Sequence, residues 1–229
     1  MLQIITSSES YIFLAVLTAL AVVALLYLLS PMSLPDEPLL YLIGVNHAIQ
    51  FKSAESQAFG ESKSVWKKRE AFRAHVAEMI DKLDIEILAE EFSQEGKRQS
   101  EVREEEAIRE KIAAELGTAP APLNWETVLE QLSEAKGIKH RFCDPDSGER
   151  KALGIKEPDS GRGRAQREQE WLSRLADYKN RRVLFVCGDD HYDAFAQLLA
   201  TNGFNVLHGP HYDISNEEFH DSQRTSPDV

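Results

Sequence analysis

Five short apolar runs lie along most of the chain and alternate with polar or amphipathic stretches. The runs occupy residues 39–45, 85–89, 138–143, 183–187 and 204–207. Because they are nearly continuous rather than alternating, they are typical of strands buried on both faces of a parallel sheet. Apolar side chains recur at helical spacing between them, at 64–83, 124–136, 165–178 and 192–201. This order predicts an α/β fold: an open, mostly parallel sheet of about five strands with flanking helices.

A separate apolar segment precedes this domain. Residues 11–29 carry no charge, and at about 1.5 Å per residue a helix of this length nearly crosses a hydrocarbon core of about 30 Å. The segment lacks the basic flank and the cleavage site of a signal peptide, so it predicts a single-pass membrane anchor. The first basic residue is Lys52, on the C-terminal side, which favours a cytoplasmic globular domain.

The chain therefore divides into an N-terminal tail (1–10), the anchor (11–29), a proline-containing linker (30–38), the α/β domain (39–215) and a disordered tail (216–229). Inside the domain, residues 100–116 are charged on all sides and predict a solvated helix. Residues 144–164 are polar and too long for a simple connection, so they predict a mobile loop or lid. Asn124 is expected to cap the helix over 124–136, and Gly137 to end it.

Composition narrows the function. The formal net charge of −12 argues against a nucleic-acid partner, because binding to phosphates requires a basic surface. Cys143 and Cys187 lie near the ends of predicted buried strands, which is typical of reduced core cysteines; a disulfide is the alternative. The oligomeric state stays open.

Polar side chains follow four of the predicted strands. In open α/β sheets, ligands bind beyond the carboxyl ends of the strands. The residues at these ends, in chain order, are Gly44, Asn46, His47, Gln50; Glu90, Glu91; Asp144, Asp146; and Gly188, Asp189, Asp190, His191. Two imidazoles and several carboxylates are thus directed to one edge, where we expect a site. The candidate substrate-binding residues are Gly44, Asn46, Gln50, Gly188 and Asp144.

These residue types support two chemistries. A divalent metal ion of the Mn, Co or Zn class would take its ligands from His47, Glu90, His191 and Asp190. Alternatively, a histidine paired with a carboxylate would activate water without a metal. Each residue type also has an ordinary structural role: a histidine can serve as a surface or core residue, a glutamate can cap a helix, and Asp144 before Pro145 is a turn signal.

Three stretches carry a family resemblance: LIGVNH at 42–47, ILAEE at 87–91 and VLFVCGDDHYDAFAQLLATNGFNV at 183–206. They resemble the TIKI/TraB superfamily, which includes TraB-like proteins, erythromycin esterases and ChaN-like haem-binding proteins. Its signature is two Gly-x-x-His motifs, a glutamate after the second strand, and an arginine–acid pair about one helix before the second motif. REQEW at 167–171 fills that last place.

The resemblance covers nearly all of residues 39–207 and implies a hydrolase-like site of His47, His191, Glu90 and Arg167. Glu91 is the adjacent alternative to Glu90, because the alternation of side chains along the strand is uncertain by one residue. Glu168 joins Arg167 as a candidate. The superfamily often has small or apolar residues where this chain has Asp189 and Asp190, which would either ligate a metal, cap a helix or tune the neighbouring histidine.

Two hypotheses follow. In the first, the protein is a membrane-anchored hydrolase of ester or peptide bonds acting on a small-molecule or peptide substrate. Arg167 would orient a carboxylate or stabilise an oxyanion, and the segment 144–164 would gate the site. In the second, the same fold is a non-catalytic sensor or ligand-binding module, with haem as one candidate ligand; a purely structural tethered domain is a third reading. HGPH at 208–211 has the spacing of a metal-ligand pair but is expected to be a surface loop.

Overall fold

The computed structural model of the chain describes residues 37–52, 56–57, 60–98, 111, 114–115, 124–155 and 161–213. The chain divides into two units, Met1–Glu37 and Pro38–Val229, and the fold described here is that of the second. The predicted anchor, nearly all of the linker, most of the charged segment 100–116 and the predicted tail lie outside the described residues. Of the helices within those ranges, none combines the length and the apolar character needed to span a bilayer.

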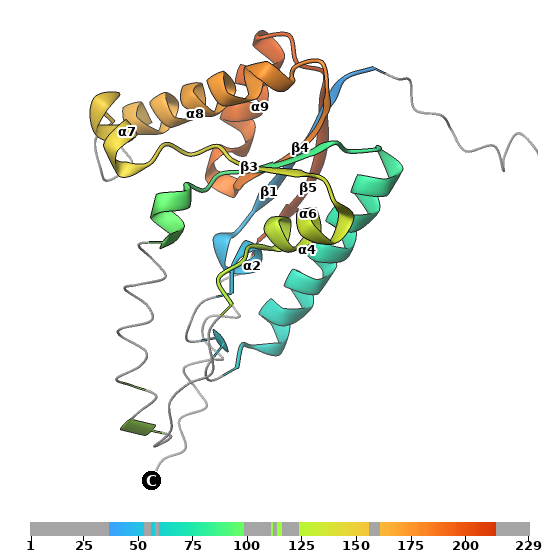
Figure 1. Cartoon of the computed structure of the whole chain (residues 1–229), viewed down its shortest axis with the longest axis vertical. Helices are drawn as coiled ribbons and strands as arrows, with labels where there is room; N and C mark the ends of the chain where they lie inside the picture. Colours follow the sequence, from blue (N-terminus) through green and yellow to red (C-terminus); the bar gives the residue numbers. More distant parts are fainter. Residues whose placement is uncertain are drawn as a thin grey trace, which may run out of the picture. The chain divides into compact units, whose positions relative to one another are not determined.

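A sheet of five parallel strands forms the centre of the domain (Figure 1). The strands are β1 Leu39–Val45, β2 Ile87–Glu90, β3 Lys139–Phe142, β4 Arg182–Gly188 and β5 Val206–Tyr212. Their order in the sheet is β3-β2-β4-β1-β5, so that β4 is the central strand and lies between β2 and β1. The predicted α/β fold with five strands and flanking helices is confirmed, and the sheet is parallel throughout.

Two helical layers cover the sheet (Figure 1). Helices α4 (Lys63–Lys82) and α6 (Val128–Lys136) lie on one side, and α8 (Gly161–Leu175) and α9 (Tyr192–Thr201) on the other. The connections β1-α4-β2 and β2-α6-β3 move along the sheet in one direction, whereas those through α8 and α9 move back. Because such crossovers are right-handed, reversing direction places the helices on the opposite face.

The apolar core on the α8–α9 side shows which side chains of the strands face these two helices. Trp171 of α8 packs on Phe185 of β4 and Phe195 of α9, with ring centroids 5.8 and 5.2 Å away. Ile87 and Ala89 belong to the same buried cluster. Since side chains alternate along a strand, Leu88 and Glu90 of β2 face the other way, toward α4 and α6, and the next residue returns to the α8 side.

The first residue of helix α6 corrects one local prediction. Helix α6 begins at Val128 rather than near Asn124, because Thr127 and Glu130 form a capping box, in which Thr127 Oγ1 accepts from Glu130 N and Glu130 Oε2 accepts from Thr127 N. Gly137 ends the helix as expected, with φ of 66°.

The predicted lid over 144–164 is wrong for most of its length. Asp146 and Glu149 form a second capping box, which starts helix α7 (Ser147–Ala152), and α8 begins at Gly161. Asp146 caps α7, and Gly154, with φ of 67°, follows its end, so these two residues act as helix-end signals rather than as signals of an open loop. Only residues 156–160 lie outside the described chain here.

HGPH is part of β5 and not a loop. The pairing with β1 shifts between His208, opposite Leu42, and His211, opposite Gly44, so three residue steps on β5 match two on β1. Such a bulge relieves the ladder around Gly209 and Pro210, and proline is tolerated because β5 is an edge strand.

Candidate functional site

Glu91 is the centre of a buried polar network at the carboxyl ends of β2 and β4. Its Oε1 accepts a hydrogen bond from Arg167 Nη2 at 2.7 Å, and its Oε2 accepts one from the Gly188 backbone N–H at 2.6 Å. Glu91 is 4% exposed. A buried carboxylate requires charged or N–H partners of this kind, because it has lost its hydration.

Arg167 of α8 is held in place by a second carboxylate. Its Nε donates to Asp144 Oδ1 at 2.8 Å, and Trp171 Nε1 donates to the same oxygen at 2.9 Å. Arg150 pairs with the other oxygen of Asp144. Arg167 therefore joins Asp144 to Glu91, and both residues support the Glu91 carboxylate. From the sequence, Asp144 was expected to bind substrate or form a turn, and Arg167 to contact substrate.

His191 lies between two carboxylates. Its Nδ1 is 2.7 Å from Glu168 Oε1, and its Nε2 is 3.4 Å from Glu91 Oε1. The ring packs edge-on against Trp171, with centroids 4.8 Å apart. Both nitrogens thus face acceptors, and the residue is buried, as is Glu168. His191 is therefore better suited to a fixed structural place in the network than to binding a metal ion.

His47, in contrast, is exposed. It starts the one-turn helix α2 (His47–Gln50), which Asn46 caps by accepting from Ala48 N at 3.0 Å. Its ring packs against Phe92, with centroids 5.4 Å apart. Among the residues that the structure describes, no side chain or backbone group hydrogen-bonds to this ring. Its nitrogens are therefore available to a ligand or to water.

Gly188 is where His47 and Glu91 meet. A Cβ atom added to this glycine would lie 3.1 Å from Glu91 Oε2 and 3.3 Å from His47 Nε2. Both groups thus approach the same side of the Gly188 Cα, which only the smallest residue permits. Gly44 is crowded in a similar way, by Asp189 and His211 and by the ring of Tyr192 at 2.9 to 3.2 Å.

Glu90 faces the opposite side of the sheet and has its own donors. Thr127 Oγ1 and His140 Nε2 each lie 2.7 Å from Glu90 Oε1, and Gln50 Nε2 donates to Oε2. Glu90 is fully buried. The structure therefore brings Glu91, and not Glu90, to His47 and His191. It also gives Gln50 a partner inside the protein, where the sequence had suggested substrate.

The two aspartates before His191 turn away from this network. The side chain of Asp190 is 84% exposed, with Oδ2 3.7 Å from Arg164 Nη2, and Asp189 pairs with His211. The contacts of His47, Glu90, His191 and Asp190 thus do not fit a shared metal ion. Within the described ranges, no three His, Cys, Asp or Glu side chains are arranged to hold one.

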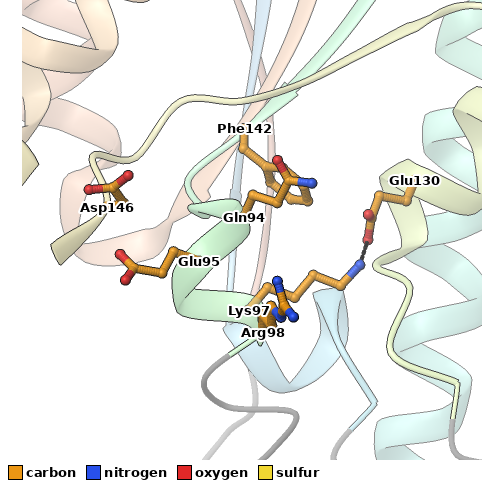
Figure 2. Close-up of a pocket in the computed structure, with 7 residues that line it drawn as sticks. All are labelled: Gln94, Glu95, Lys97, Arg98, Glu130, Phe142 and Asp146. Atoms are coloured by element: carbon orange, nitrogen blue, oxygen red, sulfur yellow. Dashed lines mark hydrogen bonds and ion pairs between the residues drawn. The ribbon is translucent and has the colours of Figure 1, made fainter. Parts of the chain in front are cut away.

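Two hollows adjoin the polar networks. The larger has a volume of about 580 Å³, and Lys97 reaches across it to pair with Glu130 (Figure 2). The smaller, about 330 Å³, is lined in part by Asp144 and His140. Neither is lined by Glu91, His47 or His191. The smaller hollow thus reaches the networks through Asp144 and His140, whereas none of the described donors to the two glutamate carboxylates lines the larger one.

Comparison of the chain with protein-family models, with curated proteins and with solved structures found no match. The resemblance to the TIKI/TraB superfamily thus rests on the motif residues themselves. Among the network members that sequence reasoning missed are Thr127 and His140, which contact Glu90. No local pattern distinguishes them, since their role arises only where α6 and β3 meet the buried Glu90.

Proposed function

We propose that the domain is a hydrolase of ester or peptide bonds in which His47 and Glu91 activate a water molecule beside Gly188. The observation that carries the proposal is the meeting of His47 Nε2 and Glu91 Oε2 within 3.3 Å of one point beside the Gly188 Cα. Because that point is too near the Gly188 Cα for a water oxygen, the proposed water lies farther out, between the imidazole nitrogen and the carboxylate oxygen. This pairing is the usual requirement for general-base activation of water.

The reaction uses His47 as the proton carrier. Water attacks the substrate carbonyl carbon and forms the new C–O bond, while its proton passes to His47 Nε2. When the tetrahedral intermediate collapses, the bond to the leaving oxygen or nitrogen breaks and His47 returns the proton to that atom. Glu91 orients the water through its carboxylate. His47 fits this role because its ring is exposed and has no hydrogen-bond partner among the described residues.

The remaining residues hold Glu91 still. Arg167 and the Gly188 N–H fix its two oxygens, Asp144 and Trp171 fix Arg167, and His191 closes the network with Glu168. Preorganisation of this kind matters because a displacement of about 1 Å can cost a factor of about 100 in rate. The proposed substrate is a small molecule or peptide, and residues 11–29 would anchor the enzyme to a membrane with the domain on the cytoplasmic side.

Hydrolysis by the full chain in mild detergent tests the proposal. A panel of p-nitrophenyl esters, lactones and peptides is assayed after EDTA treatment and again with added Mn²⁺, Co²⁺ or Zn²⁺. We expect His47→Ala and Glu91→Gln each to lower kcat/KM at least about 100-fold, in the range for loss of a general base. His208→Asn changes an exposed histidine of β5 outside the network and should leave kcat/KM within about twofold.

Other results of this assay would contradict the proposal. If the wild-type chain hydrolyses nothing under any of these conditions, the proposal fails. A Soret band on haem titration that is lost in His47→Ala would then favour the binding module. Hydrolysis that requires added metal and persists in Glu91→Gln would contradict the activation of water by His47 and Glu91.

A further inference from the structure

Helix α2 is too short to be stable alone, although it carries the proposed base. It has four residues, His47 to Gln50, whereas isolated helices shorter than about 12 residues are marginal in water. The position of the His47 ring therefore depends on what holds this turn from outside. Two contacts from other elements do so.

The first contact joins α2 to the buried Glu90. Gln50, at the end of the turn, is fully buried, and its Nε2 donates to Glu90 Oε2. Its Oε1 has no hydrogen-bond partner, so the bond to Glu90 is the one that fixes the amide. Glu90 is fixed in turn by Thr127, before α6, and by His140 on β3, each at 2.7 Å.

The second contact comes from Arg69 of α4. Its Nε donates to the Ile49 carbonyl at 3.0 Å and its Nη2 to the Phe51 carbonyl at 3.3 Å; the guanidinium also bonds the Ala48 carbonyl and pairs with Glu61. These are the carbonyls that the end of a helix leaves unsatisfied. Arg69 thus holds the backbone of the turn, whereas Glu90 holds its last side chain.

We infer that Glu90 is a positioning residue: acting through Gln50, it fixes the α2 turn and so the His47 ring beside Gly188. The two adjacent glutamates then serve one reaction from opposite faces of the sheet. Glu91 contacts the water, and Glu90 sets the place of the base. The catalytic meaning of this inference rests on the proposed function, whereas the mechanical link does not.

NMR of the full chain labelled with ¹³C-histidine tests the link without a substrate. The His47 Cε1–Hε1 signal is assigned by its loss in His47→Asn. Gln50→Met keeps the side-chain length but removes the amide, so we expect the His47 signal to shift and broaden. Ser133→Ala is the matched control, because it removes a buried 2.7 Å hydrogen bond to the Glu130 carbonyl in α6, away from α2, and it should leave that signal in place.

A double-mutant cycle shows whether Glu90 acts through Gln50. Glu90→Gln should move the His47 signal in the wild-type background and produce no further change in the Gln50→Met background, because the link is already broken. Should Glu90→Gln fail to fold, Gln50→Asn, which is one methylene too short to reach Glu90, provides a second test. An unmoved His47 signal in Gln50→Met and Gln50→Asn, or additive effects in the cycle, would overturn the inference.

Turnover separates this inference from the proposed function. With a hydrolysed substrate, Gln50→Met should lower kcat about 10- to 100-fold and change KM less than about twofold, as expected when a base is displaced but binding is retained. A raised KM with an unchanged kcat would instead indicate that Gln50 binds the substrate, and it would contradict the inference. If the His47 signal moves as expected but no substrate is hydrolysed, the link stands and the proposed function fails.

Discussion

Glu90 and Glu91 are neighbours in sequence and both are buried, yet their surroundings differ. Glu90 accepts from an amide, a hydroxyl and an imidazole, all on the α4–α6 side of the sheet. Glu91 accepts from a guanidinium and a backbone N–H on the α8 side. Beside Glu91 stands Gly188, which has no side chain to fill the space, and beyond it the exposed His47.

The two glutamates differ in the kind of group that surrounds them. Both glutamates are paired, but the donors of Glu90 are side chains that enclose it completely, with 0% of the residue exposed. One donor of Glu91 is a glycine backbone, so no side chain at position 188 separates the carboxylate from His47.

Removing the cation beneath Glu91 should be the most destabilising change. Arg167→Met leaves Glu91 and Asp144 buried without their shared guanidinium, which should cost about 3–5 kcal/mol of unfolding free energy. Urea unfolding followed by circular dichroism measures it. Arg181→Met is the control, since the Arg181–Glu86 pair is largely exposed, at 55% and 37% of the side chains, and should cost less than about 1 kcal/mol. Equal losses in the two variants would contradict the buried network.

Adding a methyl group at Gly188 should lower activity more than stability. In Gly188→Ala the new methyl group would stand 3.1 Å from Glu91 Oε2 and 3.3 Å from His47 Nε2. We expect a stability loss of about 1–3 kcal/mol and a fall in kcat/KM of about 10- to 100-fold. Gly161→Ala is matched to it, because nothing lies within 4 Å of a Cβ there. Hydrolysis unaffected by Gly188→Ala would mean that the reaction occurs elsewhere.

Weakening the support of Arg167 should have a smaller effect. Trp171→Phe retains most of the buried ring but loses the Nε1 bond of 2.9 Å to Asp144. The expected cost is about 1–2 kcal/mol, the range for a hydrogen bond to a charged group. Thermal unfolding of this variant beside Phe195→Leu distinguishes the lost bond from altered packing. No change in Trp171→Phe would show that Asp144 needs only its two arginines.

The cysteines should report a closed core by not reacting. Burial raises the pKa of Cys143 to about 12, and burial together with Glu91 raises the pKa of Cys187 well above its ordinary value. Raised folded-state values mean that the neutral thiols contribute stability below the unfolded pKa, which is lost only as pH rises toward the folded values. At pH 8 we expect iodoacetamide to label neither cysteine in the folded chain and both in urea. Labelling of Cys187 without urea would indicate that the Glu91 face opens.

Much of the fold could be read from local pattern. Four of the five runs coincide with strands to within about two residues at each end. Burial on both faces explains the apolar sequence of β1, β2 and β4, whereas the predicted burial of β3 is wrong, because β3 is a partly exposed edge strand. The fifth run continues into HGPH, where a bulge and a proline conceal an edge strand. The expected lid failed for a related reason: capping boxes at Asp146 and Thr127 use the same polar residues as turns do.

The site divides in the same way. The residue types of the site, and the strand ends that carry them, can be predicted from the sequence. Both Gly-x-x-His motifs and the Glu-Glu pair stand where apolar runs stop, and the Arg-Glu pair stands in the helical stretch before the fourth run. Which glutamate meets the histidines does not follow, because that depends on which face of β2 is covered by α8. The deciding contact, Arg167 to Glu91, joins residues 76 positions apart. Hydrophobic pattern sets strands and helices within short windows, whereas pairing across such separations is decided only when the sheet order and its two helical layers have formed.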